Sequence, residues 1–168
     1  MKRHRLLKAA AVAVLAGAMI PSAASKVAAQ QYDATWTCQN LGNGAMEPLG
    51  GQAGPMMSVG DYACVATSGP MAGGVDTGRA VLVFDQSGGK LMTGTGVIRK
   101  PDATAAYVVT DEKFDFVTSD GKVAGVKSIG HGRYVLATGS AASLAGRSFT
   151  IETEPAGPNQ FIVNEKYE

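Results

Sequence analysis

The feature that most limits how this chain can fold is the alternation of apolar and polar residues that begins at Ala34. Residues 147–154 show it most clearly, because Phe149, Ile151 and Thr153 fall on one face and three polar residues on the other. Successive side chains of a β-strand point to opposite faces, whereas a helix would need apolar residues three or four positions apart. Apart from one possible helical turn at 141–144, the chain after Ala34 lacks that helical period. We therefore predict an all-β protein.

Strand-like segments recur at the spacing of about 8–12 residues that is typical of β-sandwiches and β-barrels. Glycine, proline and short polar clusters separate them, and the best hairpin signal is Ser119-Asp120-Gly121-Lys122. We predict an antiparallel barrel, calycin-like or similar, of about eight or nine strands, with a β-sandwich as the alternative. The strand-like segments from which these strands are expected to form are 34–38, 61–67, 80–84, 90–99, 105–110, 113–118, 122–129, 133–138, 147–154 and 160–167.

Four segments carry more specific expectations. Residues 40–60, rich in glycine, are expected to form a long loop, and residues 80–84, apolar on both faces, a central strand buried on each side. Gly94 and Gly96 suggest a bend or bulge in their strand. Gly130-His131-Gly132 is expected to be a free turn that leads into the next strand.

The first 29 residues have the pattern of a secretory signal peptide. A basic start is followed by the uncharged run Ala9–Ile20 and by the small residues Val27-Ala28-Ala29, where cleavage is expected, with Ser22-Ala23-Ala24 as a second candidate. Twelve apolar residues are too few to span a bilayer, which needs about 20 in a helix. The first cysteine is Cys38, too late for a lipoprotein. We predict a signal peptide at 1–29 and one all-β domain at 30–168, in the periplasm or secreted.

Removing this leader reverses the sign of the net charge. Five of the 15 Lys and Arg residues and none of the 14 Asp and Glu residues lie within it, so the remaining domain has 10 basic and 14 acidic side chains. Binding to phosphates requires clustered basic residues, and Arg99-Lys100 is the only adjacent pair left. We expect no nucleic-acid partner and at most peripheral contact with membranes.

Cys38 and Cys64 are the only cysteines, and both lie in the part of the chain expected to leave the reducing cytosol. A disulfide between them is the simplest prediction, because the spacing is not that of a Cys-x-x-Cys redox pair. With both thiols paired and one histidine left after cleavage, we expect no metal site. The chain also lacks a phosphate-binding or dinucleotide-binding glycine motif, so no cofactor is expected.

Six residues are candidates for contact with a ligand. His131 is the only histidine after cleavage, and its glycine neighbours place it, in this interpretation, at the mouth of the barrel beside Arg133. Arg99 is a second candidate for an acidic group. Tyr62, Tyr107 and Tyr134 are candidates for polar-tipped side chains that line an interior.

These observations predict a class of protein rather than a reaction. A glycine-bent barrel of eight or nine strands is able to enclose one small apolar ligand, and binding of such a ligand is the favoured function. The alternative is a protein-interaction module of the cell envelope that uses an edge strand or the loop at 42–60. A cofactorless cyclase or isomerase is the second alternative. The sequence thus favours a binding protein over an enzyme and identifies no catalytic residue.

Overall fold

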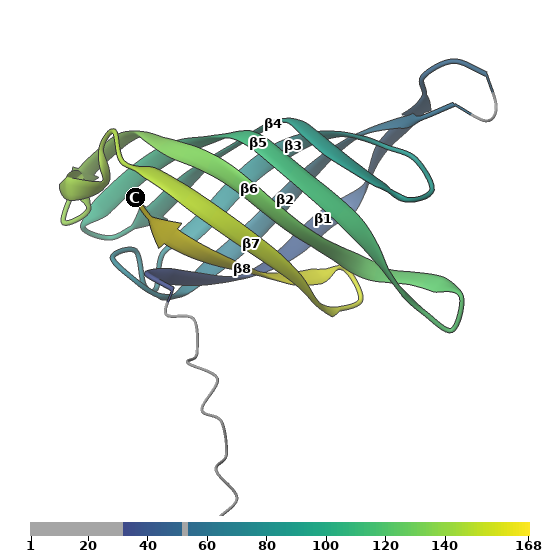
Figure 1. Cartoon of the computed structure of the whole chain (residues 1–168). Coiled ribbons are helices and arrows are strands. Elements are labelled where there is room, and N and C mark those ends of the chain that lie inside the picture. Colours follow the sequence, from purple (N-terminus) through teal and green to yellow (C-terminus); the bar gives the residue numbers. More distant parts are fainter. Residues whose placement is uncertain (1–31, 52–53) are drawn as a thin grey trace, which may run out of the picture. The chain divides into compact units, whose positions relative to one another are not determined.

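The computed structural model describes residues 32–51 and 54–168, which form one closed antiparallel barrel (Figure 1). Each strand pairs with the next in sequence, and the last pairs with the first, so the predicted antiparallel barrel is confirmed and the sandwich alternative is wrong. No helix of these residues is long and apolar enough to cross a membrane. The strands are β1 (Ala34–Pro48), β2 (Met56–Ser68), β3 (Val75–Phe84), β4 (Gly88–Lys100), β5 (Ala103–Ser119), β6 (Lys122–Gly139), β7 (Ser148–Gly157) and β8 (Gln160–Tyr167).

The expected signal peptide at 1–29 lies outside the described residues and stays a prediction.

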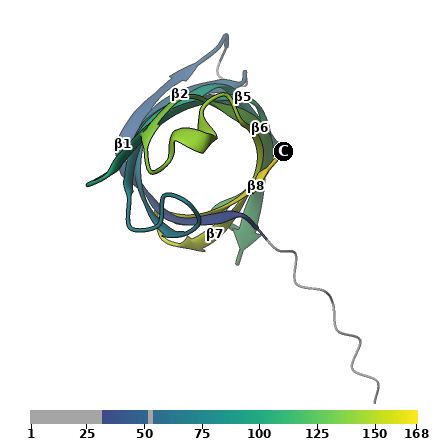
Figure 2. The ribbon, with the colours of Figure 1, turned by 90° about the vertical axis from the view of Figure 1, so that its left-hand side faces the viewer.

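The two ends of the barrel differ in how they are covered. One end, which we call the plugged end, holds the β2–β3 loop at 69–74 and the β6–β7 connection at 140–147. Met71, Ala141 and Leu144 from these segments are buried in the core. The connection contains the short 3₁₀ helix η1 (Ala142–Leu144), as the sequence predicts, and Figure 2 shows it lying across the ring of strands.

The opposite end, which we call the hairpin end, carries residues 49–51 and 54–55, which follow β1 and precede β2, and three tight turns. The turn between β5 and β6 has left-handed conformations at Asp120 and Gly121, with φ of 52° and 73°. Two such residues define the hairpin turn that Asp-Gly favours. The predicted hairpin at 119–122 is therefore confirmed.

Cys38 of β1 and Cys64 of β2 form a disulfide, as predicted. The two residues are directly opposite in the register of the two strands, with their Cα atoms 4.0 Å apart. Both side chains are buried inside the barrel. The bond therefore ties the first hairpin together from the inside.

The inner face contains a row in which two glycines separate two tyrosines. In the register of β2 to β5, Tyr62 is opposite Gly78, Gly78 is opposite Gly96, and Gly96 is opposite Tyr107. A Cβ atom added at Gly78 would overlap the ring of Tyr62, and one added at Gly96 would lie 2.7 Å from Cζ of Tyr107. Glycine at these two positions thus gives the tyrosine rings room to extend across the neighbouring strands.

The expectations for residues 40–60 and 80–84 are wrong. Residues 40–60 do not form one long loop, because β1 continues to Pro48 and β2 begins at Met56, with only 49–55 between them. The sequence has no apolar period there. Backbone pairing between Ala45–Pro48 and Met56–Val59 nevertheless extends the two strands. Residues 80–84 are half-buried and not buried on both faces, because one face of a barrel wall points outward.

The glycine-rich segments also differ from expectation. Gly94 and Gly96 pair regularly with β3, and the irregularity in β4 falls before them, at 92–93. Residues 130–132 are not a free turn but lie within β6, where Gly132 faces the ring of Phe149. Close approach of side chains inside the barrel, rather than backbone freedom, requires these glycines.

Substituting Gly96→Ala should lower the free energy of unfolding by about 1–3 kcal/mol, the usual effect of an extra methyl in a filled site. The added atom would lie 2.7 Å from Asp76 Oδ1 as well as against Tyr107. Gly60→Ala is the matched control, since a Cβ there has no atom within 4 Å. Urea denaturation of both variants measures the difference. Equal stabilities would contradict the packing role of Gly96.

Candidate functional site

A cavity of about 270 Å³ lies inside the barrel. Most of its wall is apolar, and the disulfide forms part of it. It reaches the hairpin end at the exposed Asn40, whose N–H donates to the carbonyl oxygen of Asn159 in the β7–β8 turn. The aromatic side chains of the wall are Trp36, Tyr62, Tyr107, Phe114, Tyr134, Phe149 and Phe161.

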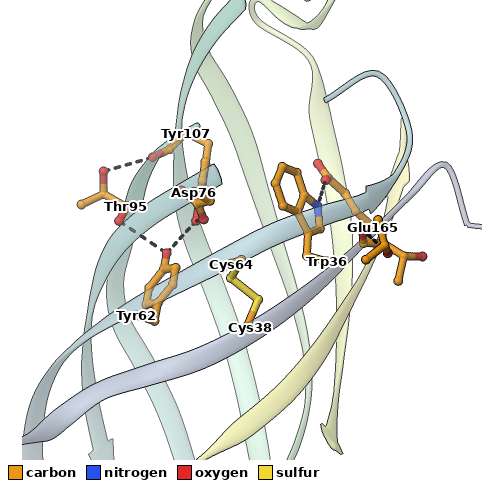
Figure 3. The surroundings of a disulfide bond; sticks show 10 residues. Trp36, Cys38, Tyr62, Cys64, Asp76, Thr95, Tyr107 and Glu165 are labelled. Carbon is orange, nitrogen blue, oxygen red and sulfur yellow. Dashed lines mark hydrogen bonds between the residues drawn. A yellow bond between two sulfur atoms is a disulfide. The ribbon is translucent and has the colours of Figure 1, made fainter. Parts of the chain in front are cut away.

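The first polar group in the wall is a chain of two tyrosines and an aspartate. The Tyr107 hydroxyl donates to Oδ2 of Asp76 at 2.6 Å, and the hydroxyls of Tyr62 and Tyr107 are 2.6 Å apart. Because Tyr107 has one proton and donates it to Asp76, its oxygen accepts from Tyr62. Figure 3 shows this chain on one side of the disulfide. This chain of hydrogen bonds depends on Gly78 and Gly96, because they give the two tyrosine rings the room that brings their hydroxyls together.

The second polar group is centred on Glu165 of β8, which is only 3% exposed. Its Oε2 accepts a hydrogen bond from Nε1 of Trp36 at 3.0 Å and another from the Tyr134 hydroxyl at 3.1 Å. Trp36 and Glu165 lie on the other side of the disulfide in Figure 3. The Tyr134 ring packs against Phe149, with centroids 5.1 Å apart, and Trp36 is buried in the same core.

A third carboxyl group, Glu112 of β5, also lines the cavity. It accepts a hydrogen bond from the Ser128 hydroxyl of β6 at 2.5 Å. Burial raises its pKa. The wall therefore contains three carboxyl groups from three different strands.

No lysine, arginine or histidine of the described residues lines this cavity. Asp76 is 3% exposed, like Glu165. Oδ1 of Asp76 and Oε1 of Glu165 are buried and have no hydrogen-bond partner among the described residues. A buried polar atom without a partner costs folding free energy, and each such atom in a native structure requires an explanation.

Burial changes the protonation of these groups. It raises the pKa of Asp76 to about 6, although the hydrogen bond from Tyr107 opposes the shift. It raises the pKa of Glu165 to about 7, against the hydrogen bonds from Trp36 and Tyr134, and the charge of Asp76 adds to the rise. Desolvation disfavours the charged form of an acid. Both carboxyl groups therefore change charge near neutral pH.

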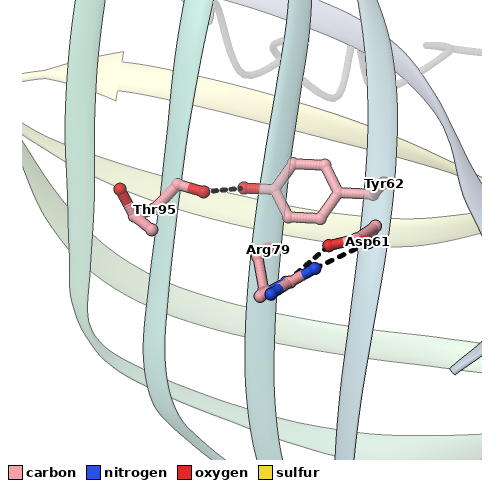
Figure 4. A network of polar contacts seen from close by, with 4 residues as sticks. All are labelled: Asp61, Tyr62, Arg79 and Thr95. Carbon is pink, nitrogen blue, oxygen red and sulfur yellow. Dashed lines mark hydrogen bonds and ion pairs between the residues drawn. The ribbon is translucent and has the colours of Figure 1, made fainter. Parts of the chain in front are cut away.

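The outer face near this site is ordinary by comparison. Asp61 and Arg79 form an exposed ion pair, with Arg79 Nε 2.7 Å from Asp61 Oδ1. Tyr62, the next residue after Asp61, extends across β3, and its hydroxyl lies 3.4 Å from the Thr95 carbonyl oxygen (Figure 4). Exposed ion pairs contribute little to stability. The candidate functional groups are therefore those that line the cavity, not the exposed ion pair.

The structure separates the six candidate residues into two groups. Tyr62, Tyr107 and Tyr134 line the cavity together. His131, Arg133 and Arg99 are exposed and do not line it. His131 and Arg133 alternate with the buried Gly130 and Gly132, so they point away from the interior. The role proposed for them at a barrel mouth has no support in this placement.

Sequence reasoning missed the three carboxyl groups and Trp36 as site residues. The signal was the same alternation that predicted the strands. Glu165 shares its face with Phe161 and Val163, and Asp76 shares its face with Ala80 and Leu82. An acid on the apolar face of a strand is unusual enough to indicate a buried polar site.

Comparison with protein-family models, with curated proteins and with solved structures gave no significant match. Residues 32–51 and 54–168 also contain no group of three or more His, Cys, Asp and Glu side chains able to hold a metal ion. The fold and the site thus define a class, a closed eight-stranded barrel with an acidic, aromatic cavity.

Replacing Glu165 with glutamine should remove the loss of stability that Glu165 causes as pH rises. With its pKa raised from 4.5 to about 7, folded Glu165 holds a proton that the unfolded chain has lost, so its contribution to stability falls as pH rises from about 4.5 to 7. Relative to wild type, Glu165→Gln should therefore gain about 3 kcal/mol between pH 4.5 and pH 8. Denaturation at both pH values measures this.

Glu154→Gln, at an exposed position of β7, is the control and should show little change relative to wild type. If Glu165→Gln shows no gain at pH 8, the pKa of Glu165 is not raised in the folded protein.

Proposed function

We propose that this protein is an exported binding protein that holds one small organic molecule inside its barrel. The observation that carries the proposal is the cavity, with its aromatic wall and its few buried polar groups. Ligand sites combine such an apolar lining with a small number of polar groups that fix orientation. The unpartnered oxygens of Asp76 and Glu165 are groups of that kind.

The size of the cavity limits the ligand. A cavity of about 150 Å³ in another protein holds benzene. At about 270 Å³, this one has room for an aromatic ring with a short chain. Met71, Ala141 and Leu144 are buried at the plugged end, so we infer that a ligand enters at the hairpin end.

The N-terminal 29 residues and the disulfide support export. The leader has the composition of a secretory signal, and disulfides persist in oxidising compartments such as the periplasm and the extracellular space. Within this proposal the protein binds its ligand outside the cytoplasm.

Trp36 provides a test, because it is the only tryptophan of the chain and lines the cavity. Its indole N–H gives a single NMR signal. Titration with 2-phenylethanol, a neutral compound of suitable size, should shift that signal in a saturable way. Ala80→Phe places a ring in the cavity and should weaken binding at least about tenfold by occupying the volume.

Val81→Phe, the neighbouring substitution on the opposite face of β3, is the control and should leave binding unchanged. Val81 does not line the cavity. Equal loss in both variants would contradict a site inside the barrel.

A further inference from the structure

We propose that the ligand held in the barrel is an organic ammonium ion, with its charged nitrogen against Glu165 and its apolar part against the aromatic wall. This inference rests on the proposed function and names the chemical class of the ligand.

The wall supplies negative charge without any compensating cation. Asp76, Glu112 and Glu165 line the cavity, and no basic side chain of the described residues does. An anionic ligand would meet like charges in a medium of low dielectric, which is strongly unfavourable. Above neutral pH, where Asp76 and Glu165 lose their protons, a neutral ligand would leave the carboxylates uncompensated. A cation removes both problems.

Glu165 has the geometry of a receptor for a donor. Trp36 and Tyr134 both bind Oε2, which fixes the carboxyl group and leaves the buried Oε1 without a hydrogen-bond partner among the described residues. Asp76 is arranged in the same way, since Tyr107 binds Oδ2 and the buried Oδ1 has no partner in the same part of the chain. An ammonium group offers three N–H donors and a full charge, and hydrogen bonds between charged partners are about twice as strong as neutral ones.

The rest of the wall suits the apolar part of such a ligand. Tyr107, Tyr134 and Phe149 form a packed group of rings with centroids 5.1–6.3 Å apart. The faces of aromatic rings carry partial negative charge and attract cations, above all when water is excluded. Acid and aromatic groups therefore favour the same kind of ligand.

The test compares three compounds of similar size and different charge at pH 8: 2-phenylethylamine, 2-phenylethanol and 3-phenylpropanoate. The Trp36 indole signal reports binding of each. We expect the amine to bind at least about tenfold more tightly than the alcohol, and the carboxylate most weakly. Glu165→Gln should reduce the affinity for the amine about tenfold and that for the alcohol less than about threefold. Glu154→Gln, on the outer face, should change neither.

The wild-type protein provides a second readout that does not depend on a variant. Because the ammonium ion favours the charged form of the carboxyl group, affinity for the amine should rise about tenfold in total between pH 5 and pH 8, while affinity for the alcohol stays nearly constant. Glu165 interacts, through hydrogen bonds or charge, with the titratable groups of Tyr134, Tyr167, Asp76 and Asp33. Asp76 interacts in the same way with Tyr107, Tyr62 and Arg99. The raised pKa values of Asp76 and Glu165 fall in this range of pH.

The outcomes separate the two proposals. If none of the three compounds shifts the Trp36 signal, binding of a small molecule in the cavity is contradicted. If the alcohol or the carboxylate binds as tightly as the amine, or if amine affinity does not change with pH, the cavity binds ligands but the inference of an ammonium ligand is overturned.

Discussion

The structure depends on closing eight strands around an interior that side chains must fill. An eight-stranded barrel is just wide enough for its inward-facing side chains, so every inner position affects the others. Here Gly78 and Gly96 leave space that Tyr62 and Tyr107 occupy from both sides. Rings that meet in this way bring hydroxyl groups into the core, and buried hydroxyls need partners. Asp76 is the partner, so the acidic character of the cavity follows from how the barrel is filled.

Electrostatics then sets this interior apart from an ordinary core. Three carboxyl groups line it, and two of them have an oxygen without a hydrogen-bond partner in residues 32–51 and 54–168. Such groups lower stability at neutral pH, and apolar residues of similar size would fill the same space at lower cost. Departures from the rules of good packing are expected at functional sites. The cavity departs from those rules, as expected of the binding site that we propose.

The barrel was predicted from the spacing of the strand-like segments and from their glycines, and the disulfide from the presence of two cysteines in a chain expected to leave the cytosol. Alternation of residues predicted the all-β class, because period two assigns faces directly, as in 147–154, where Phe149, Ile151 and Thr153 are all buried. The failures have physical causes. A bulge at Val135 between β5 and β6 leaves Leu136 exposed, although alternation places it with the buried Tyr134. Strand length at 40–48 depends on pairing with β2, which no local pattern records.

The site was harder to predict than the fold. The glycines on either side of His131 suggested a flexible turn with an accessible histidine ring. In the structure, Gly130 and Gly132 make room on the inner face for Glu112 and Phe149, and His131 lies on the outer face. Glu165 and Asp76 were overlooked because each is a single acid on the inward face of its strand and has polar neighbours in the sequence. Their importance depends on Trp36, Tyr134 and Tyr107, which come from distant strands that only the closed barrel brings together.

The most direct test of this account is a ¹³C NMR titration of the Glu165 side-chain carboxyl group, with and without 2-phenylethylamine. The account predicts that its pKa is near 7 in the free protein and falls when the amine is bound, because the ammonium ion stabilises the charged form. A pKa in the ordinary range in the free protein, or one that saturating amine does not change, would contradict it.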